Sequence, residues 1–146
     1  MLKAYMWRMK YQEIVTPDSF YVGLTGLEQW AKQTKQPMDR AILHSLIAGI
    51  YADYAANNQW ELRRRTEIVE EAPSADLREW TANIFVEKVR TNVKEALADS
   101  VLLLKTSSRD YIPFVELGET SEYYHHDMYH LLASRGIESL NRIERL

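Results

Sequence analysis

SADLREWTANIFVEKVRTNVKEALADSVLLLK, residues 74–105, is the stretch that decides the fold. Its apolar side chains recur at steps of three and four, which at about 3.6 residues per turn places them on one face of a helix. This face comprises Leu77, Trp80, Thr81, Ile84, Phe85, Val89, Val93, Ala96, Leu97, Val101 and Leu104. The opposite face is charged. We therefore predict one continuous amphipathic helix, about 45 Å long at ~1.5 Å per residue, along which the rest of the chain packs.

The composition limits the class of protein. A chain of 146 residues is long enough for one domain with its own core. The absence of cysteine excludes disulfides, thiolate metal sites and thiol catalysis, and it fits a reducing compartment. A net charge of -3 lacks the basic excess of a non-specific nucleic-acid binder. No apolar run exceeds four residues, far below the ~20 that span a bilayer, so we expect a cytoplasmic protein with no membrane segment.

Two helices are predicted before the central stretch. Thr25 and Glu28 have the spacing of a capping box, which indicates a short helix ending near Gln36. Pro37 suits the first turn of the next helix, and Asp39 complements the positive end of its dipole. The apolar face of this second helix, which we place at residues 37–58, comprises Leu43, Leu46, Ile47, Ile50 and Tyr54.

The N-terminal segment has a different period. Tyr5, Trp7, Met9 and Tyr11 alternate with polar, basic or flexible side chains, which is typical of a half-buried strand. Residues 20–24 could supply a second strand that closes a hairpin. We therefore predict a strand-like segment at residues 1–24, appended to a helical core at residues 25–146.

Residues 59–71 fit either a helix or a strand. Apolar and polar side chains alternate from residue 60 to residue 68, yet residues 61–65 are all good helix formers. Three successive arginines at residues 63–65 are offset by Glu67, Glu70 and Glu71. This balance indicates a solvated, salt-bridged surface, with an anion or phosphate site as the alternative.

After the central stretch, Pro113 predicts a loop or edge segment at residues 111–117, because proline cannot sit in a central strand. A helix is predicted at residues 122–135, ended by Gly136 as a left-handed C-cap. A short closing helix follows at residues 137–143. Together these patterns predict a mainly α fold, a small helical bundle packed along one long central helix, with a short N-terminal β-strand or hairpin.

One histidine cluster has metal-ligand spacing. Glu122, His126 and His130 are four residues apart, so a helix would align them within reach of a single ion. His44 lies at the edge of the apolar face of an earlier helix and would point inward. His44, His126 and His130 would make a three-histidine site with open positions for water. The alternative is that these histidines are hydrogen-bonded core or interface residues with no metal.

This arrangement resembles that of the DinB-like metal-dependent helical bundles, in which one histidine lies on the second helix and two stand four apart near the C-terminus. The resemblance covers His44, His126, His130 and their rough separation. It implies a divalent metal, such as zinc, nickel or iron, and a hydrolase or transferase reaction on a small substrate.

The aromatic content favours a different function. Nine tyrosines and four tryptophans exceed what one small core requires, and these residue types are enriched in protein interfaces. The residues least committed to the helical core are Tyr5, Trp7, Tyr11, Tyr123, Tyr124 and Tyr129. Our leading interpretation is a non-enzymatic regulatory, adaptor or assembly protein without a cofactor, which binds a protein partner or self-associates. The metal-dependent enzyme is the alternative, and the negative net charge argues against nucleic acid.

Overall fold

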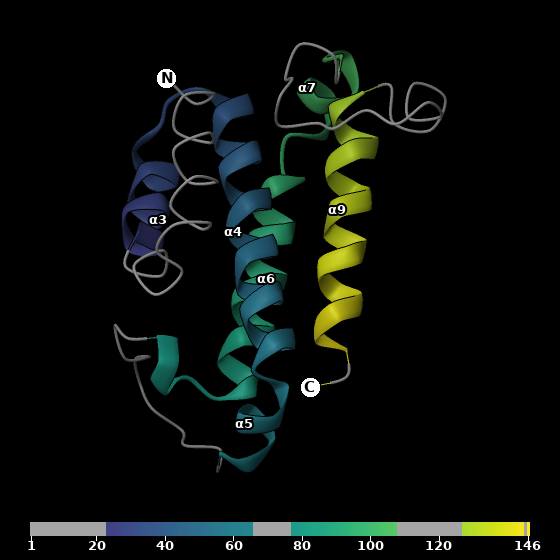
Figure 1. Ribbon diagram of the computed structural model, residues 1–146. Coiled ribbons are helices and arrows are strands. Elements are labelled where there is room, and N and C mark those ends of the chain that lie inside the picture. Colours follow the sequence, from purple (N-terminus) through teal and green to yellow (C-terminus); the bar gives the residue numbers. More distant parts are fainter. Residues whose placement is uncertain (1–22, 66–76, 108–126, 145) are drawn as a thin grey trace, which may run out of the picture.

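The computed structural model describes residues 23–65, 77–107, 127–144 and 146. Within these ranges the chain is mainly helical and has no strand, which confirms the predicted α class (Figure 1). The helices in chain order are α3 (Gly23–Gln33), α4 (Pro37–Asn57), α5 (Gln59–Arg64), the 3-10 turn η1 (Leu77–Glu79), α6 (Ala82–Ala96), α7 (Ser100–Lys105) and α9 (Met128–Ile143). The predicted N-terminal strand or hairpin lies almost wholly outside the described residues, and Gly23 and Leu24 at its end belong to α3.

The central long helix is α4, and α3, α6 and α9 all pack against it. Figure 1 shows α3 on one side of α4 and α9 on the other, with α6 running beside it. Local signals account for its length. Pro37 stands at its start and Asp39 in its first turn, and the side-chain amide of Asn58 donates to the carbonyl of Tyr54 at 2.9 Å at its end. The predictions for residues 25–36 and 37–58 are thereby confirmed to within a few residues.

The prediction of one continuous helix over residues 74–105 is wrong. The stretch divides into η1, α6 and α7, with non-helical backbone at Trp80 and Thr81 and again at residues 97–99. Asp99 lies outside the helical region, and its carboxylate accepts from the amide of Leu102 at 3.3 Å. An aspartate that caps a new helix competes with continuation of the old one, because its side chain satisfies a free amide of the next first turn. The central axis is therefore α4, with α6 packed against it.

The prediction of one helix over residues 122–135 that ends at Gly136 is wrong. Asp127 has extended backbone angles, φ -117° and ψ 163°, and α9 begins only at Met128. Gly136 does not end this helix, which continues to Ile143 and includes the residues assigned to a separate closing helix. Gly136 is buried instead against Val93 of α6. A glycine can mark a close helix contact as well as a C-cap, and here it marks the contact.

The open assignment at residues 59–71 is settled in part, because α5 makes residues 59–64 helical. The three glutamates expected to balance the arginines lie outside the described residues, as does the loop predicted at residues 111–117. No described helix combines the length and apolar character that a membrane span requires.

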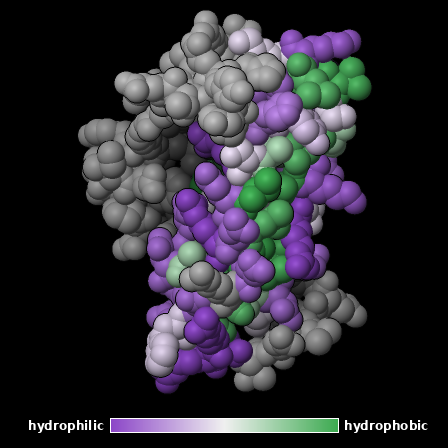
Figure 2. Space-filling model, turned by 90° about the vertical axis from the view of Figure 1, so that its right-hand side faces the viewer, coloured by the Kyte–Doolittle hydropathy of each residue, from purple (hydrophilic) through white to green (hydrophobic). Residues whose placement is uncertain are grey.

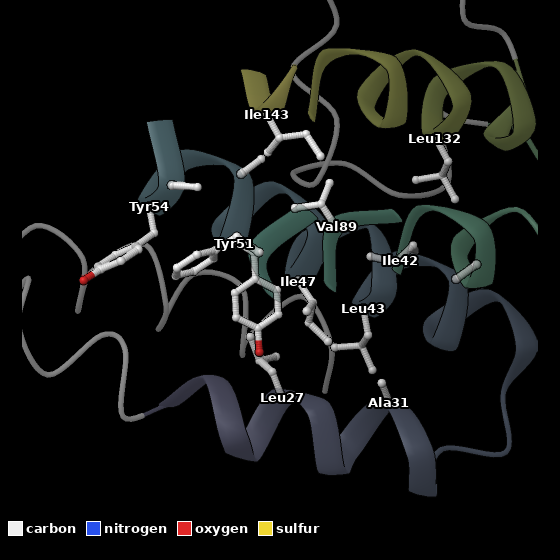
Figure 3. Packing of buried hydrophobic residues seen from close by; sticks show 14 of the residues in the cluster. Leu27, Ala31, Ile42, Leu43, Ile47, Tyr51, Tyr54, Val89, Leu132 and Ile143 are labelled. Atoms are coloured by element: carbon white, nitrogen blue, oxygen red, sulfur yellow. The ribbon is translucent and has the colours of Figure 1, made fainter. Parts of the chain in front are cut away.

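The core is built on two sides of α4. Figure 3 shows Leu27 and Ala31 of α3 directed at α4 from one side, and Leu132 and Ile143 of α9 from the opposite side. One end of this core is aromatic, made by Tyr51, Tyr54, Trp80 and Phe85. The rings of Tyr54 and Phe85 are stacked with centroids 5.4 Å apart, and those of Trp80 and Phe85 lie 5.3 Å apart. Such pairs contribute about 0.5–1.5 kcal/mol beyond area burial, so they fix how η1 and α6 meet α4.

Candidate functional site

A cavity of about 470 Å³ lies between α3, α4 and α6. Glu28 and Lys32 line it from α3, His44 and Ile47 from α4, and one face of α6 over residues 83–92 completes it. Its volume is within the ~300–1,000 Å³ typical of small-molecule sites. The cavity combines apolar side chains with charged groups of both signs, and it contains the histidine that the sequence pattern singled out.

His44 is held by Asn92, a residue of α6 that faces the core. Nδ1 of His44 lies 2.8 Å from the Oδ1 atom of Asn92, and the side-chain amide of Asn92 donates to the carbonyl of Lys88 at 2.8 Å. Because the side-chain NH2 group of Asn92 donates to the Lys88 carbonyl, the side-chain oxygen of Asn92 faces the imidazole of His44. An amide oxygen only accepts, so Nδ1 of His44 carries the proton in this contact. In the neutral ring, Nε2 is then an unprotonated acceptor.

That Nε2 atom is buried and has no hydrogen-bond partner among the described residues. A buried polar atom without a partner costs roughly 1–3 kcal/mol relative to a satisfied one. Such an atom is rare in folded proteins, and an ordered water molecule, an ion or a ligand can complete its bonding. His44 was correctly expected at the edge of an apolar face, although its partner Asn92 was not anticipated.

The charged groups around the cavity differ in how they are paired. The ammonium group of Lys88 lies 3.7 Å from a carboxylate oxygen of Glu28 and 5.4 Å from the ring centroid of Trp80. The same carboxylate of Glu28 accepts a hydrogen bond from the hydroxyl group of Tyr51. Lys32 is exposed and forms no ion pair with another described residue. Within the described part of the chain, Lys88 of the cavity is therefore paired and Lys32 is not.

Tyr51 lies behind the cavity lining and donates a hydrogen bond to Glu28, which lines the cavity. Burial foremost, and then the hydrogen bond and charge of Glu28, raise the pKa of the Tyr51 phenol well above its ordinary value near 10. The phenol thus stays protonated and holds the Glu28 carboxylate in place. Glu28 in turn holds Lys88 through the ion pair.

His130 lies at the start of α9 and has a carboxylate partner. Asp127 is buried and caps the helix, because its Oδ1 atom accepts from the backbone amide of His130 at 2.8 Å. The Nδ1 atom of His130 lies 2.7 Å from Oδ2 of the same carboxylate. The imidazole is about half exposed, so Asp127 orients a ring that stays open to solvent.

The structure describes only part of the predicted metal set. Glu122 and His126 lie outside the described residues, whereas His44 lines the cavity and His130 contacts Asp127. The backbone at Asp127 is extended and α9 begins at Met128, so this helix carries His130 alone of the predicted set. No group of three His, Cys, Asp or Glu side chains that could hold a metal ion occurs within the described ranges. The three-histidine site stays a prediction.

Tyr129 is the one described member of the predicted aromatic surface. It is half-buried against the core, and its ring meets that of His130 edge-on with centroids 5.9 Å apart. The other five residues, Tyr5, Trp7, Tyr11, Tyr123 and Tyr124, lie outside the described ranges. The aromatic surface as a whole therefore stays a prediction.

Large aliphatic side chains are exposed where no aromatic surface was predicted. Val101 is 62% exposed, Leu104 50% and Ile137 60%. These residues lie on α7 and α9, which pack against each other. Figure 2, which faces this side of the molecule, shows a hydrophobic band between hydrophilic flanks. We call Val101, Leu104 and Ile137 the α7–α9 surface. Periodicity assigned Val101 and Leu104 to a buried face, and the break at residues 97–99 separates them from the buried row of α6.

Comparison of the chain with family models, curated proteins and solved structures finds no match. The resemblance to DinB-like bundles therefore depends on its three histidines alone.

Proposed function

We propose that the protein is a non-enzymatic regulatory, adaptor or assembly protein that acts through protein contacts. The observation that carries the proposal is the exposure of Val101, Leu104 and Ile137 on two helices that pack together. Full burial of a large aliphatic side chain contributes about 1.5–3 kcal/mol, and roughly half of this is still available at each of the three positions. Large aliphatic side chains exposed on neighbouring helices are typical of an interaction site.

The occupant that we propose first is a second copy of the same chain. The three residues of the α7–α9 surface are helical, and the side of the molecule shown in Figure 2 has a hydrophobic band between hydrophilic flanks. Two such surfaces related by a twofold axis would bury their apolar centres together and keep the flanks in solvent. The aromatic residues Tyr5, Trp7, Tyr11, Tyr123, Tyr124 and Tyr129 belong to the proposal as additional contacts.

Light scattering coupled to gel filtration, run over a range of protein concentrations, tests the proposal. We expect a mass above that of one 17.1 kDa chain at high concentration. The double substitution Leu104→Lys and Ile137→Glu should shift the association to at least ten-fold higher concentration. Trp60→Gln is the matched control, because Trp60 is 73% exposed on α5, away from α7.

The proposal fails for self-association if the mass is that of one chain at every concentration. It also fails for the α7–α9 surface if the Trp60 variant weakens association as much as the double variant does. Circular dichroism of both variants would verify that the helices are intact, so that loss of association is not loss of fold.

A metal-dependent hydrolase or transferase is the second candidate, and the orientation of His44 favours it. Metal-ligating histidines commonly donate one ring N–H to an oxygen and coordinate through the other nitrogen. The contact from Nδ1 of His44 to Asn92 has this form and leaves Nε2 as a ligand. In this candidate His126, His130 and Glu122 complete the set and hold a divalent ion that polarises a substrate oxygen. Against it, His44 lines the cavity beside α3, whereas His130 belongs to α9, which packs on the other side of α4 (Figure 1).

Metal analysis of the purified protein tests this second candidate. Stoichiometric zinc, nickel or iron that is lost in the His126→Ala and His130→Ala double variant would favour the enzyme over the contact protein. Metal-free protein that stays metal-free after incubation with each ion, with its fold intact, would remove the enzyme from consideration.

A further inference from the structure

We propose that two copies of this chain associate by exchanging α7 and α9, with α6 and α7 of each copy joined in one helix over residues 82–105. In the structure, α7 lies beyond the end of α6, and α9 runs back along α4 (Figure 1). Straightening the connection at residues 97–99 carries α9 away from its own α4 and onto that of a second copy. The exchange is a form of the self-association proposed above, made through core contacts instead of the α7–α9 surface.

The connection between α6 and α7, which we call the hinge, comprises only Leu97, Ala98 and Asp99. It contains neither glycine nor proline, and leucine and alanine are among the best helix formers. Leu97 still donates its backbone N–H to the carbonyl of Val93 at 3.3 Å, which is the bond of a continuing helix. At Asp99 the backbone leaves the helical region, with ψ at 67°. Few backbone angles therefore have to change to make the helix continuous.

The break at the hinge is stabilised by an exposed cap. The carboxylate of Asp99 accepts from the amide of Leu102 at 3.3 Å, and the side chain of Asp99 is in solvent. In a continuous helix the same amide donates to the carbonyl of Ala98, four residues earlier. Joining the two helices thus replaces the cap with a backbone hydrogen bond and leaves no amide of the first turn of α7 without a partner.

The buried row of α6 continues in register into α7. Within α6 this row comprises Phe85, Val89, Asn92 and Ala96. Leu103, which is the buried residue of α7, follows Ala96 by seven residues, or about two turns of a helix. A helix over residues 82–105 therefore has one buried face along its whole length.

The start of α9 is joined to α7 by contacts that let the two helices move as one unit. The backbone N–H of Met128 donates to the carbonyl of Thr106 at 2.9 Å, and Ser107 and Asp127 form a β-bridge. Leu103 and Met128 are both fully buried. In the exchanged dimer these contacts stay within one chain.

The contacts that α9 makes with α4 and α6 are re-formed between the two copies. They include the close approach of Gly136 to Val93 and the ion pair of Arg142 with Asp53. Because the same residues meet in both forms, the burial of the core is unchanged, and exchange of identical elements is for this reason a low-cost route to a dimer. The dimer is then favoured by the continuous helix and by protein concentration.

Two substitutions at the hinge should shift the exchange in opposite directions. Ser100 is the first residue of α7, where proline is well tolerated, whereas proline at this position breaks a continuous helix. Ser100→Pro should therefore reduce the amount of dimer at least ten-fold, and Asp99→Ala, which removes the cap, should increase it at least three-fold. Ser100→Ala is the matched control, because alanine fits both forms. Light scattering after refolding at several protein concentrations measures the dimer, and circular dichroism verifies the fold of each variant.

A readout on the wild-type protein needs no variant. The 13Cα chemical shifts of residues 97–99 should be helical in the isolated dimer and non-helical in the monomer. Non-helical shifts in the dimer would overturn the exchange.

Size complementation identifies which chain supplies α9. Gly136→Val should clash with Val93 within every copy, and Val93→Ala removes the side chain that causes the clash. When the two variants are refolded together, exchange places α9 of the first chain on α6 of the second. The ratio of mixed dimers to Gly136→Val homodimers, measured by native mass spectrometry, should exceed that of random pairing at least five-fold. Gly136→Ala replaces Gly136→Val if the latter does not fold in the mixture.

The exchange is overturned by a mass of one chain at every concentration in both the wild type and Asp99→Ala, by random pairing of the two size variants, or by a dimer that Ser100→Pro leaves unchanged. In the last case, loss of the dimer in the Leu104→Lys and Ile137→Glu double variant would assign the association to the α7–α9 surface. A dimer that is lost in Ser100→Pro and kept in the double variant would support the exchange and exclude that surface.

Discussion

Gly136 of α9 lies so close to Val93 of α6 that a β-carbon added to the glycine would be 2.8 Å from the Cγ1 atom of the valine. That separation is shorter than carbon atoms tolerate, so the glycine sets how closely the two helices pack. The sequence pattern suggested a helix end at this position. The physical reason for glycine here is the neighbouring helix.

Gly136→Ala is expected to lower the free energy of unfolding by about 1 kcal/mol. Alanine gains roughly 1 kcal/mol of helix propensity over glycine, but overpacking of a core contact costs ~1–3 kcal/mol. Val93 is β-branched and stiff, so it does not turn aside easily. Urea denaturation would measure the change. In a Val93→Ala background the same substitution should raise stability, and a stabilised single variant would contradict the close contact.

Alkaline stability should depend on Tyr51. Its pKa is raised in the folded state, so the folded protein keeps a proton that the unfolded chain loses near pH 10. The contribution of Tyr51 is therefore complete below pH 10 and falls as the pH rises further, by up to about 1.4 kcal/mol per pH unit. Tyr51→Phe keeps the ring contacts with Trp80 and Phe85. Because it removes the hydroxyl group, it also removes the fall in unfolding free energy above pH 10 that Tyr51 causes.

The measurement for Tyr51 is the difference in unfolding free energy between wild type and Tyr51→Phe from pH 7 to pH 11. Near pH 7 the variant should be less stable by about 1–3 kcal/mol, because the hydrogen bond to Glu28 is lost. The difference should shrink above pH 10. A difference that stays constant over the whole range would mean that the phenol ionises as freely in the folded state as in the unfolded one.

Local signals in the sequence were enough to predict α4, whereas they misled at residues 74–105. The start of α4 is marked by Pro37 and Asp39, and its end by Asn58, all acting within a turn. In the later stretch the apolar steps of three and four continue through residues 97–104, so periodicity predicts a single helix. Asp99 caps a new helix in the middle of this periodic stretch, so its local signal opposes the apolar periodicity. The packing of α7 on α9 then favours two separate helices over one continuous helix.

The candidate site was only half predictable, for a related reason. His44 stood at the edge of an apolar face, and that position follows from its own helix. Its partner Asn92 is 48 residues away, and helical periodicity carries no information about a contact between two helices. A signal for Asn92 does exist, because it is the one polar residue in the buried row of α6 that otherwise comprises Phe85, Val89 and Ala96.

The start of α9 should depend on Asp127. Its carboxylate accepts from the amide of His130 and lies within 2.9 Å of Nδ1 of that histidine. Asp127→Ala should lower the free energy of unfolding by about 1–2 kcal/mol, the usual loss for a helix cap. Asp127→Asn keeps a cap oxygen and should cost less.

Asp99→Ala is the comparison for the Asp127 variants in the same denaturation experiment. It removes an exposed cap of a six-residue helix and should cost about 0.5 kcal/mol, the low end for a cap. Equal losses in the two alanine variants would show that the buried position of Asp127 adds nothing to its role as a cap.

The pairing of His44 with Asn92 predicts non-additive stability. Asn92→Leu leaves Nδ1 of His44 without its acceptor, and His44→Leu leaves the Asn92 oxygen without its donor. Each single variant should therefore lose about 1–3 kcal/mol, the cost of an unpaired buried polar group. The double variant should lose at least about 1 kcal/mol less than the sum, because neither group remains to be left unpaired. Denaturation of the four proteins measures this difference. As a control, Asn83→Leu changes an exposed position in the first turn of α6 and should change stability by less than about 0.5 kcal/mol. Strict additivity would mean that the two side chains stabilise the fold separately, and the assignment of Nε2 as the free acceptor would lose its basis.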